Sequence, residues 1–373
     1  MKKVVVIIPT YNEKDNIEAT LEDLEKAFKD VASEYEMHVL VVDDTSPDGT
    51  AELVKQKIKK YQNIHLFINP EKKGLGAAYI NGMKYAMEKL NADLVFEFDA
   101  DGSHRPKYIP AMLQEISKGA DVVVGSRYVP GGSMPDDWGV NRKIVSYFGN
   151  LIARVVLLTF QYKDMTSGFR VSKTEFLKKI DLDNLLSKQY AYKIHLYFAL
   201  HKLKANIVEY PIEFIDRAKG KSKFPKNNVI DSLKVVFTLR LRDSEKFIKF
   251  AIVGGTGFII QTIVFKILLG SNIHRSLAVS IGAELAIISN FTFNNIWTFK
   301  SNKISGLKLI PKFISFNLTS LLAIGIQALI LWLGPLLLGV SNLSIWVSYF
   351  IALIIVMIVN FTIYNRIIWK TKR

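Results

Sequence analysis

Two carboxylates separated by one residue follow a short apolar run, and these residue types could bind a metal ion. Asp99-Ala100-Asp101 directly follows residues 94–98. A run of this length predicts a buried strand, which would carry both side chains to the edge where open α/β sheets bind ligands. Carboxylate oxygens suit Mg²⁺ or Mn²⁺ shared with a diphosphate. The motif alone is weak evidence, because acidic pairs are also common on exposed surfaces.

Polar residues also follow two earlier predicted strands. Pro9-Thr10-Tyr11-Asn12-Glu13 follows residues 4–8, and Asp43-Asp44 follows residues 39–42. At a shared sheet edge, a carboxylate could accept hydrogen bonds from a base or a ribose hydroxyl, and Tyr11 could flank the base. The alternative is that residues 44–50 form only a turn and a helix cap.

Closely spaced glycines at Gly74 and Gly76 resemble a phosphate-binding loop. No Gly-x-Gly-x-x-Gly spacing or P-loop lysine accompanies them. The sequence therefore argues against a P-loop or a dinucleotide site, and it favours a tight helix start.

The elements that would position these residues alternate between strand and helix. Apolar runs lie at 4–8, 39–42, 64–67, 94–98 and 122–124, and helical patterns lie near 13–30, 50–60, 75–90, 106–118, 141–160 and 190–203. A turn is expected at 164–170, and extended segments around 206–215. This alternation predicts an α/β fold with a doubly wound, mostly parallel sheet.

The C-terminal third has the composition of a membrane protein. Four apolar stretches, 250–269, 277–299, 313–338 and 345–363, are each near the length of about 20 residues that spans a bilayer. Apolar residues at helical spacing among basic ones predict interfacial amphipathic helices before them. We therefore expect a soluble domain at 1–228, interfacial helices at 229–248 and a four-helix transmembrane domain at 249–373. The apolar run after Met1 stops after five residues, which predicts a strand and not a signal peptide.

The charge distribution favours a membrane surface over nucleic acid as the partner of the basic residues. The net charge is +15, from 49 basic against 34 acidic residues. Lys and Arg are frequent at 300–312 and 366–373, whereas the opposite loops carry only Arg275. Short basic loops stay in the cytoplasm, so both termini and the soluble domain are expected there. The absence of cysteine excludes disulfides and a thiol nucleophile.

Several motifs follow one another in the first 225 residues. They are Pro9-Thr10-Tyr11-Asn12-Glu13, Asp43-Asp44-x-Ser46-Pro47-Asp48-Gly49-Thr50, Gly74-Leu75-Gly76, Asp99-Ala100-Asp101-x-Ser103-His104, Gly125-Ser126-Arg127-Tyr128, Thr166-Ser167-Gly168-Phe169-Arg170 and Arg217-x-x-Gly220-x-Ser222-Lys223. In this order they resemble the dolichol-phosphate mannosyltransferases, family 2 glycosyltransferases of GT-A fold. The later segments 249–255 and 290–299 resemble the GtrA-type membrane domain.

This resemblance implies transfer of mannose from GDP-mannose to dolichyl or another polyprenyl phosphate. It implies that Asp99 and Asp101 hold Mg²⁺ or Mn²⁺, and that Asp101 and Arg127 are catalytic. Some relatives carry Gln where Ser103 stands, so a metal contact from Ser103 stays open. The implied donor-binding residues are Pro9, Tyr11, Glu13, Val42, Asp44, Asp99, Ala100, Asp101, Arg127, Arg217 and Lys223, and the acceptor phosphate would meet Arg127, Ser133, Arg142 and Lys143.

The chemistry of the acceptor favours a single inverting displacement. A phosphate monoester has a second pKa near ~6, so it can attack without losing a proton, and we assign no general base to His104. Arg142 and Lys143 could instead face lipid headgroups. We expect the basic loop at 217–228 to become ordered over bound ligands. Glu284, inside the second apolar stretch, is expected to face the bundle interior or to pair with Asn290 or Asn294.

Two other functions remain open at this stage. A polyprenyl-phosphate glucosyltransferase would keep the reaction and change the sugar, since no pattern identifies the sugar-contacting residues. A lipid-linked sugar transporter would use the spans to move the product. The second function has little support, because the spans contain only one central acid, Glu284.

Overall fold

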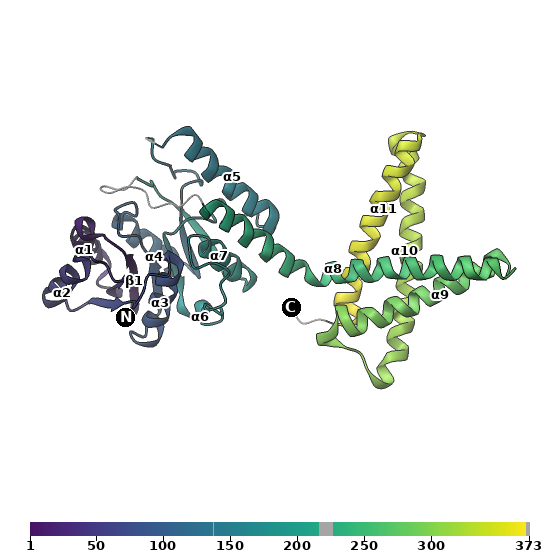
Figure 1. Ribbon diagram of the computed structural model, residues 1–373. Helices are drawn as coiled ribbons and strands as arrows, with labels where there is room; N and C mark the ends of the chain where they lie inside the picture. The colour runs from purple at the N-terminus through teal and green to yellow at the C-terminus, as the bar shows by residue number, and fades with distance from the viewer. Residues whose placement is uncertain (137, 216–226, 371–373) are drawn as a thin grey trace. The chain divides into compact units, whose positions relative to one another are not determined.

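The computed structural model describes residues 1–136, 138–215 and 227–370. They form two compact units, Met1–Arg240 and Leu241–Arg373 (Figure 1). The boundary between the units falls within one long helix, α8 (Asn227–Gly270). The segment expected to form separate interfacial helices, 229–248, is thus the first part of a helix that continues into the first apolar stretch.

The described part of the first unit contains a seven-stranded sheet in the order β3-β2-β1-β4-β6-β5-β7. Only β6 runs antiparallel to its neighbours, so the prediction of a mostly parallel, doubly wound sheet is confirmed. The strands are β1 (Lys2–Thr10), β2 (Tyr35–Asp43), β3 (Ile64–Ile68), β4 (Leu94–Glu97), β5 (Val122–Ser126), β6 (Arg170–Lys173) and β7 (Ile207–Pro211).

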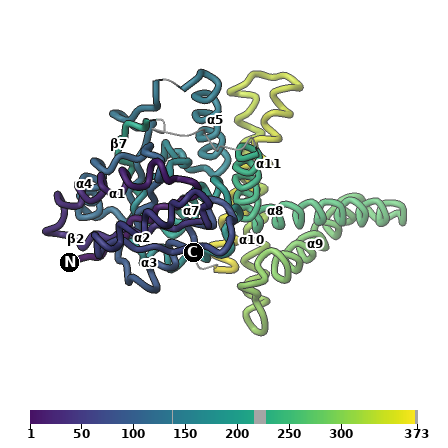
Figure 2. Tube along the Cα trace, turned by 60° about the vertical axis from the view of Figure 1, so that its left-hand side comes forward, coloured from purple at the N-terminus to yellow at the C-terminus, as the bar shows by residue number. Residues whose placement is uncertain are grey.

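Helices cover both faces of this sheet (Figure 1, Figure 2), because successive strand residues point to opposite sides. Val4, Val6 and Ile8 pack with residues of α1, α2 and α4, whereas Val5 and Ile7 pack with residues of α3, α5, α7 and the start of α8. The helices are α1 (Lys14–Phe28), α2 (Thr50–Lys60), α3 (Leu75–Glu88), α4 (Ile109–Ser117), α5 (Val140–Leu157) and α7 (Tyr192–Lys202), with a short α6 (Thr174–Leu177) after β6.

The strand register brings the predicted chemistry to one edge of the sheet. Thr10 pairs with Asp43, and Ile7 pairs with Glu97, so β1, β2 and β4 end close together. Residues 11–13 and 44 directly follow β1 and β2, and residues 99–101 come after β4 with one residue between them. The edge expected to bind a ligand is therefore formed as predicted.

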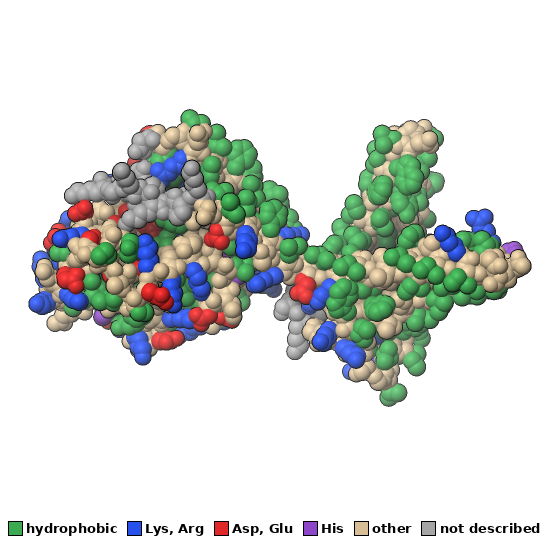
Figure 3. Space-filling view, viewed as in Figure 1, with side chains coloured by type: hydrophobic (Ala, Val, Ile, Leu, Met, Phe, Trp, Pro, Cys, Tyr) green, Lys and Arg blue, Asp and Glu red, His purple; other side chains and the backbone are tan. Residues whose placement is uncertain are grey.

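The second unit contains the later part of α8 with α9 (Arg275–Phe293), α10 (Leu309–Leu338) and α11 (Asn342–Ile363). Among the described residues, four helices are long and apolar enough to cross a membrane, as the sequence predicts. Hydrophobic side chains cover much of their outer surface (Figure 3).

An aromatic cluster closes one part of this membrane unit. Trp369 stacks on Phe299 with 4.5 Å between ring centroids, and it also contacts Phe291 and Phe316. Its indole Nε1 donates to Asn295 Oδ1 at 3.0 Å. The Asn295 side chain also bonds the backbone N–H and C=O of Ile304, so one side chain ties together the segment after α9 and the segment after α11.

The expectation that Glu284 faces the interior of the bundle is wrong for the described unit. The buried positions of α9 are Ala278, Gly282, Ala286 and Phe291, of which the first three are one turn apart, whereas Glu284 is exposed. A position two residues from Gly282 points to the other side of the helix, which explains the difference. Asn290, considered as its partner, instead packs against Gly257.

Candidate active site

A cavity of about 190 Å³ lies at the carboxyl edge of the sheet, where β1, β2 and β4 end. Three chain segments far apart in sequence contribute to it, together with the start of α3 and the residues before α7. Its described lining residues are Pro9, Thr10, Tyr11, Glu13, Asp44, Lys72, Gly74, Leu75, Ala78, Asp99, Ala100, Asp101, Gln189 and Tyr190.

Seven of the residues implied to bind the nucleotide sugar line this cavity. They are Pro9, Tyr11, Glu13, Asp44, Asp99, Ala100 and Asp101. Val42 is different: its side chain is fully buried in β2 and faces Gly82 of α3. The structure therefore places Val42 in the core, outside the described lining.

The two neighbouring carboxylates after β2 have separate roles. Asp43 accepts hydrogen bonds from the Thr10 hydroxyl and from the N–H and hydroxyl of Ser46, so it holds the turn. Asp44 lines the cavity and accepts one bond from Asn69 Nδ2, at 2.6 Å. Burial raises the pKa of Asp44, and the Asp43 charge acts in the same direction. Only Asp44 is thus placed to meet a ligand.

Lys72, Gln189 and Tyr190 are among the lining residues that the sequence did not predict to bind a ligand. Lys72 places its ammonium 3.4 Å from the centre of the Tyr11 ring, so a cation and an aromatic face stand together at the cavity. Gln189 and Tyr190 come from the segment before α7. The adjacent Lys72-Lys73 before Gly74 was an available signal for a cationic wall, whereas nothing local marks Gln189.

A close backbone approach fixes the wall formed by Gln189 and Tyr190. Gly74 has φ +113°, and a Cβ there would lie 2.6 Å from the carbonyl oxygen of Lys188. The Ala77 N–H donates to the same oxygen at 3.2 Å. Gly74 therefore begins α3 tightly, as predicted, and lets the two segments meet.

Asp99 is held by partners on its inner side. The Tyr79 hydroxyl donates to Oδ1 at 2.6 Å, and the backbone N–H of Asp99 donates to His104 Nδ1 at 2.9 Å. Burial lowers the pKa of His104, and Lys193 and Arg127 act in the same direction against Asp99 and Asp101. Because Nδ1 accepts a bond, the neutral ring carries its proton on Nε2, 3.6 Å from Asp99 Oδ2. His104 thus supports the loop.

The donor set at the cavity fits a divalent ion completed by a substrate. Mg²⁺ is commonly bound by one or two carboxylates together with phosphate oxygens and water, and Asp99 and Asp101 supply two carboxylates. Ser103 is buried, and its N–H donates to Asp101 Oδ1 at 3.1 Å. Within the described ranges, no cluster of three His, Cys, Asp or Glu side chains could hold an ion by itself.

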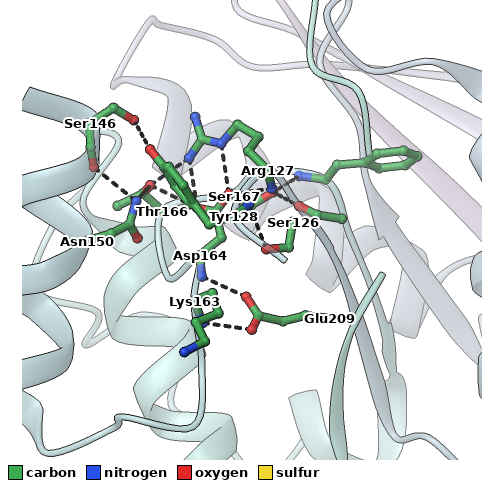
Figure 4. Close-up of polar contacts among 12 residues, drawn as sticks. Ser126, Arg127, Tyr128, Ser146, Asn150, Lys163, Asp164, Thr166, Ser167 and Glu209 are labelled. Carbon is green, nitrogen blue, oxygen red and sulfur yellow. Dashed lines mark hydrogen bonds and ion pairs between the residues drawn. The ribbon is translucent and has the colours of Figure 1, made fainter. Parts of the chain in front are cut away.

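Arg127 follows β5 and forms a buried ion pair with Asp164 (Figure 4). Its Nε and Nη2 donate to the two carboxylate oxygens at 2.8 and 2.7 Å, and Nη2 also donates to the Thr166 hydroxyl. Arg127 is not among the described lining residues, although its charge reaches His104. No sequence pattern indicates Asp164 as the partner of Arg127.

The residues expected at the acceptor phosphate are not among the described lining residues of the cavity. Ser133 forms an isolated bridge with Glu213, and the Lys143 ammonium donates to the carbonyl of Asp136 at 3.2 Å. The Arg142 guanidinium stacks 3.8 Å from the centre of the Trp138 ring. Arg217 and Lys223, and most of the basic loop at 217–228, lie outside the described residues.

Comparison with known proteins identifies the family. Residues 5–181 match the model described as glycosyl transferase family 2, and residues 249–369 match the GtrA/DPMS transmembrane domain. A dolichol-phosphate mannosyltransferase of Pyrococcus furiosus is 30% identical over 372 residues, which is 99% of this chain and 100% of that protein. The chain belongs to the dolichol-phosphate mannosyltransferase family. It is a glycosyltransferase with a GT-A unit and an integral membrane unit.

Two bacterial proteins match about three fifths of this chain. An undecaprenyl-phosphate mannosyltransferase of Micrococcus luteus is 40% identical over 221 residues, covering 59% of this chain and 87% of that protein. A polyprenol monophosphomannose synthase of Mycolicibacterium smegmatis is 37% identical over 233 residues, covering 62% and 84%. Both similarities cover less than two thirds of this chain, whereas the Pyrococcus furiosus protein matches 99% of it.

Proposed function

We propose that this protein transfers mannose from GDP-mannose to dolichyl or another polyprenyl phosphate at the cytoplasmic face of a membrane. The observation that carries the proposal is the cavity in which Tyr11, Asp44 and the Asp99–Asp101 pair meet. The names of the full-length and bacterial relatives support the sugar and the lipid acceptor. The membrane unit would keep the enzyme next to an acceptor that stays in the bilayer.

Different residues of the cavity would contact different parts of the donor. Tyr11 would flank the guanine, and Asp44 would accept a hydrogen bond from the base or the ribose. Lys72 would add a positive charge to the same wall. When bound, Mg²⁺ or Mn²⁺ would be held by Asp99 and Asp101 and would neutralise charge on the departing diphosphate.

The transfer needs no proton to move. An oxygen of the lipid phosphate would form a bond to the anomeric carbon while the bond from that carbon to the diphosphate breaks, which inverts the configuration. Arg127, fixed by Asp164, would supply a cation of constant orientation, and Ser133, Arg142 and Lys143 would meet the lipid phosphate. Positioning and charge stabilisation would account for catalysis.

A donor panel tests this proposal. The purified full-length protein would be incubated in detergent with labelled polyprenyl phosphate, a divalent ion and either GDP-mannose, GDP-glucose or UDP-glucose. The expected result is product from GDP-mannose, and NMR of this product should show that the anomeric configuration has been inverted. Preferential use of a glucose donor would overturn the sugar assignment, and lipid-linked sugar moved across sealed vesicles without its synthesis would favour a transporter.

A further inference from the structure

Lys193 is a buried lysine next to Asp99, one of the two carboxylates proposed to hold the metal ion. It lies on α7, its side chain is 6% exposed, and its Nζ is 3.8 Å from Asp99 Oδ2. A buried charge is costly unless it is paired, so this placement points to a specific role. The carboxylate within ion-pair distance of it among the described residues is Asp99.

The surroundings hold the ammonium in this position. Nζ lies 5.9 Å from the centre of the Tyr79 ring and 5.5 Å from that of Tyr190. It also packs against Gly168, where a Cβ would collide with it. Tyr79 in turn binds Asp99 Oδ1, so the aromatic wall and the lysine fix the same carboxylate from two directions.

This arrangement changes the charge of the cavity. Asp99 and Asp101 bring two negative charges, and a cation at ion-pair distance from Asp99 cancels part of their attraction for a divalent ion. A nucleoside diphosphate would bring further negative charge and further oxygen ligands. The diphosphate would therefore raise the affinity of the site for the ion. Thermodynamic linkage then requires the ion to raise the affinity for the diphosphate by the same factor.

We propose that Lys193 is a positioning residue that holds Asp99 and weakens binding of a divalent cation until a nucleoside diphosphate occupies the cavity. The inference rests on the proposed function, because it concerns the same metal and donor site. Its consequence is an ordered preference: the free enzyme holds the ion loosely, and the diphosphate and the ion bind cooperatively.

Mn²⁺ binding to the full-length protein, measured by electron paramagnetic resonance of free Mn²⁺, tests this inference. Without nucleotide, Lys193→Gln and Lys193→Met should each bind Mn²⁺ about tenfold more tightly than the wild type, since a charge this close has such an effect even in a water-like dielectric. Saturating GDP should reduce this difference in Mn²⁺ affinity between the wild type and the two neutral variants. Lys193→Arg should resemble the wild type, and Asp101→Asn should bind weakly.

A matched control separates this effect from a change in net charge. Lys57→Gln removes a lysine whose side chain is also largely buried and paired, with Glu18 and Glu22, away from the described lining of the cavity. It should leave Mn²⁺ affinity unchanged. Binding by Lys193→Gln but not by the wild type would also support the proposal.

Unchanged or weaker Mn²⁺ binding in both neutral Lys193 variants would overturn the proposed role of Lys193. A failure of the wild type and of every Lys193 variant to bind Mn²⁺ would also overturn it. Structural damage at the site would weaken binding, so the expected tightening cannot come from misfolding. The proposed transferase function is tested separately by the donor panel, and it would be overturned if the wild type formed no product from any donor.

Discussion

Charged side chains around the cavity differ in what each of them contacts. Asp101 lines the cavity and accepts a bond from the Ser103 backbone, whereas Asp164 is completely buried and bound to Arg127. Sequence motifs mark Asp101 and Arg127, but they do not indicate that Asp164 is buried against Arg127 while Asp101 faces the cavity. The two aspartates therefore lead to different expectations.

Removal of the Asp101 carboxylate should abolish transfer without unfolding the protein. Asp101→Ala removes one ligand of the expected ion, and losses of about a hundredfold or more are typical when a group that stabilises developing charge is removed. EDTA should inactivate the wild type, and Mg²⁺ or Mn²⁺ should restore it. Rates of product formation measure both effects, with the exposed Asp23→Ala as control. Undiminished turnover of Asp101→Ala would contradict the metal assignment.

Removal of the Asp164 charge should instead reduce stability. Burial alone would raise the pKa of Asp164, but the charge and hydrogen bonds of Arg127 hold it below its ordinary value of 3.8. A lowered pKa stabilises the folded state above pH 3.8, and this contribution is lost as the pH falls through the folded-state pKa. Asp164→Asn should therefore cost about 3 kcal/mol at pH 7, and less below pH 3.8.

Unfolding of Asp164→Asn and the wild type, followed by tryptophan fluorescence at pH 7 and at pH 3.5, measures this difference. Asp183→Asn is the matched control, because Asp183 also pairs with a cation, Lys84, but is largely exposed. Equal destabilisation by the two variants at pH 7 would contradict a structural role for the Arg127–Asp164 pair.

Most of the elements could be predicted from local sequence, and those that could not depend on distant partners. The strands with continuous apolar runs were all found. The sequence predicts no strand at 170–173, because Arg-Val-Ser-Lys has no such run and only Arg170 falls within the turn expected at 164–170. The segment forms the strand β6 because β4 and β5 pair with it from both sides. Lys193 escaped prediction because α7 is buried on most sides, so its sequence shows no polar face.

The start of α3 depends on its contact with the segment before α7. Gly74→Ala should destabilise the protein by about 1–3 kcal/mol and weaken donor binding, because the residue has a positive φ and no room for a methyl group. Gly139→Ala is the matched control: its φ is −55°, and open space surrounds the position of its Cβ. Unfolding midpoints and the KM for GDP-mannose measure the two effects. Similar behaviour of both alanine variants would contradict the close approach.

At the scale of the whole molecule, the absence of cysteine makes the membrane topology directly testable. Single cysteines at the exposed positions Ser301 and Ser271 would lie in loops at opposite ends of α9. If the basic loops are cytoplasmic, an impermeant maleimide should label Ser271→Cys in intact cells and Ser301→Cys only after permeabilisation. Reversed labelling would place the catalytic unit on the other side.

The contact of Trp369 with Asn295 has a consequence for how the protein is made. The ribosome synthesises Trp369 after the residues that it contacts here: Phe291, Asn295, Phe299, Phe316 and Tyr364. Until Trp369 emerges, the Asn295 side chain lacks one of its hydrogen bonds, and four aromatic rings lack a neighbour. A nascent chain that stops short of Trp369 would therefore carry an unfinished membrane unit, which a quality-control protease could distinguish from a completed one.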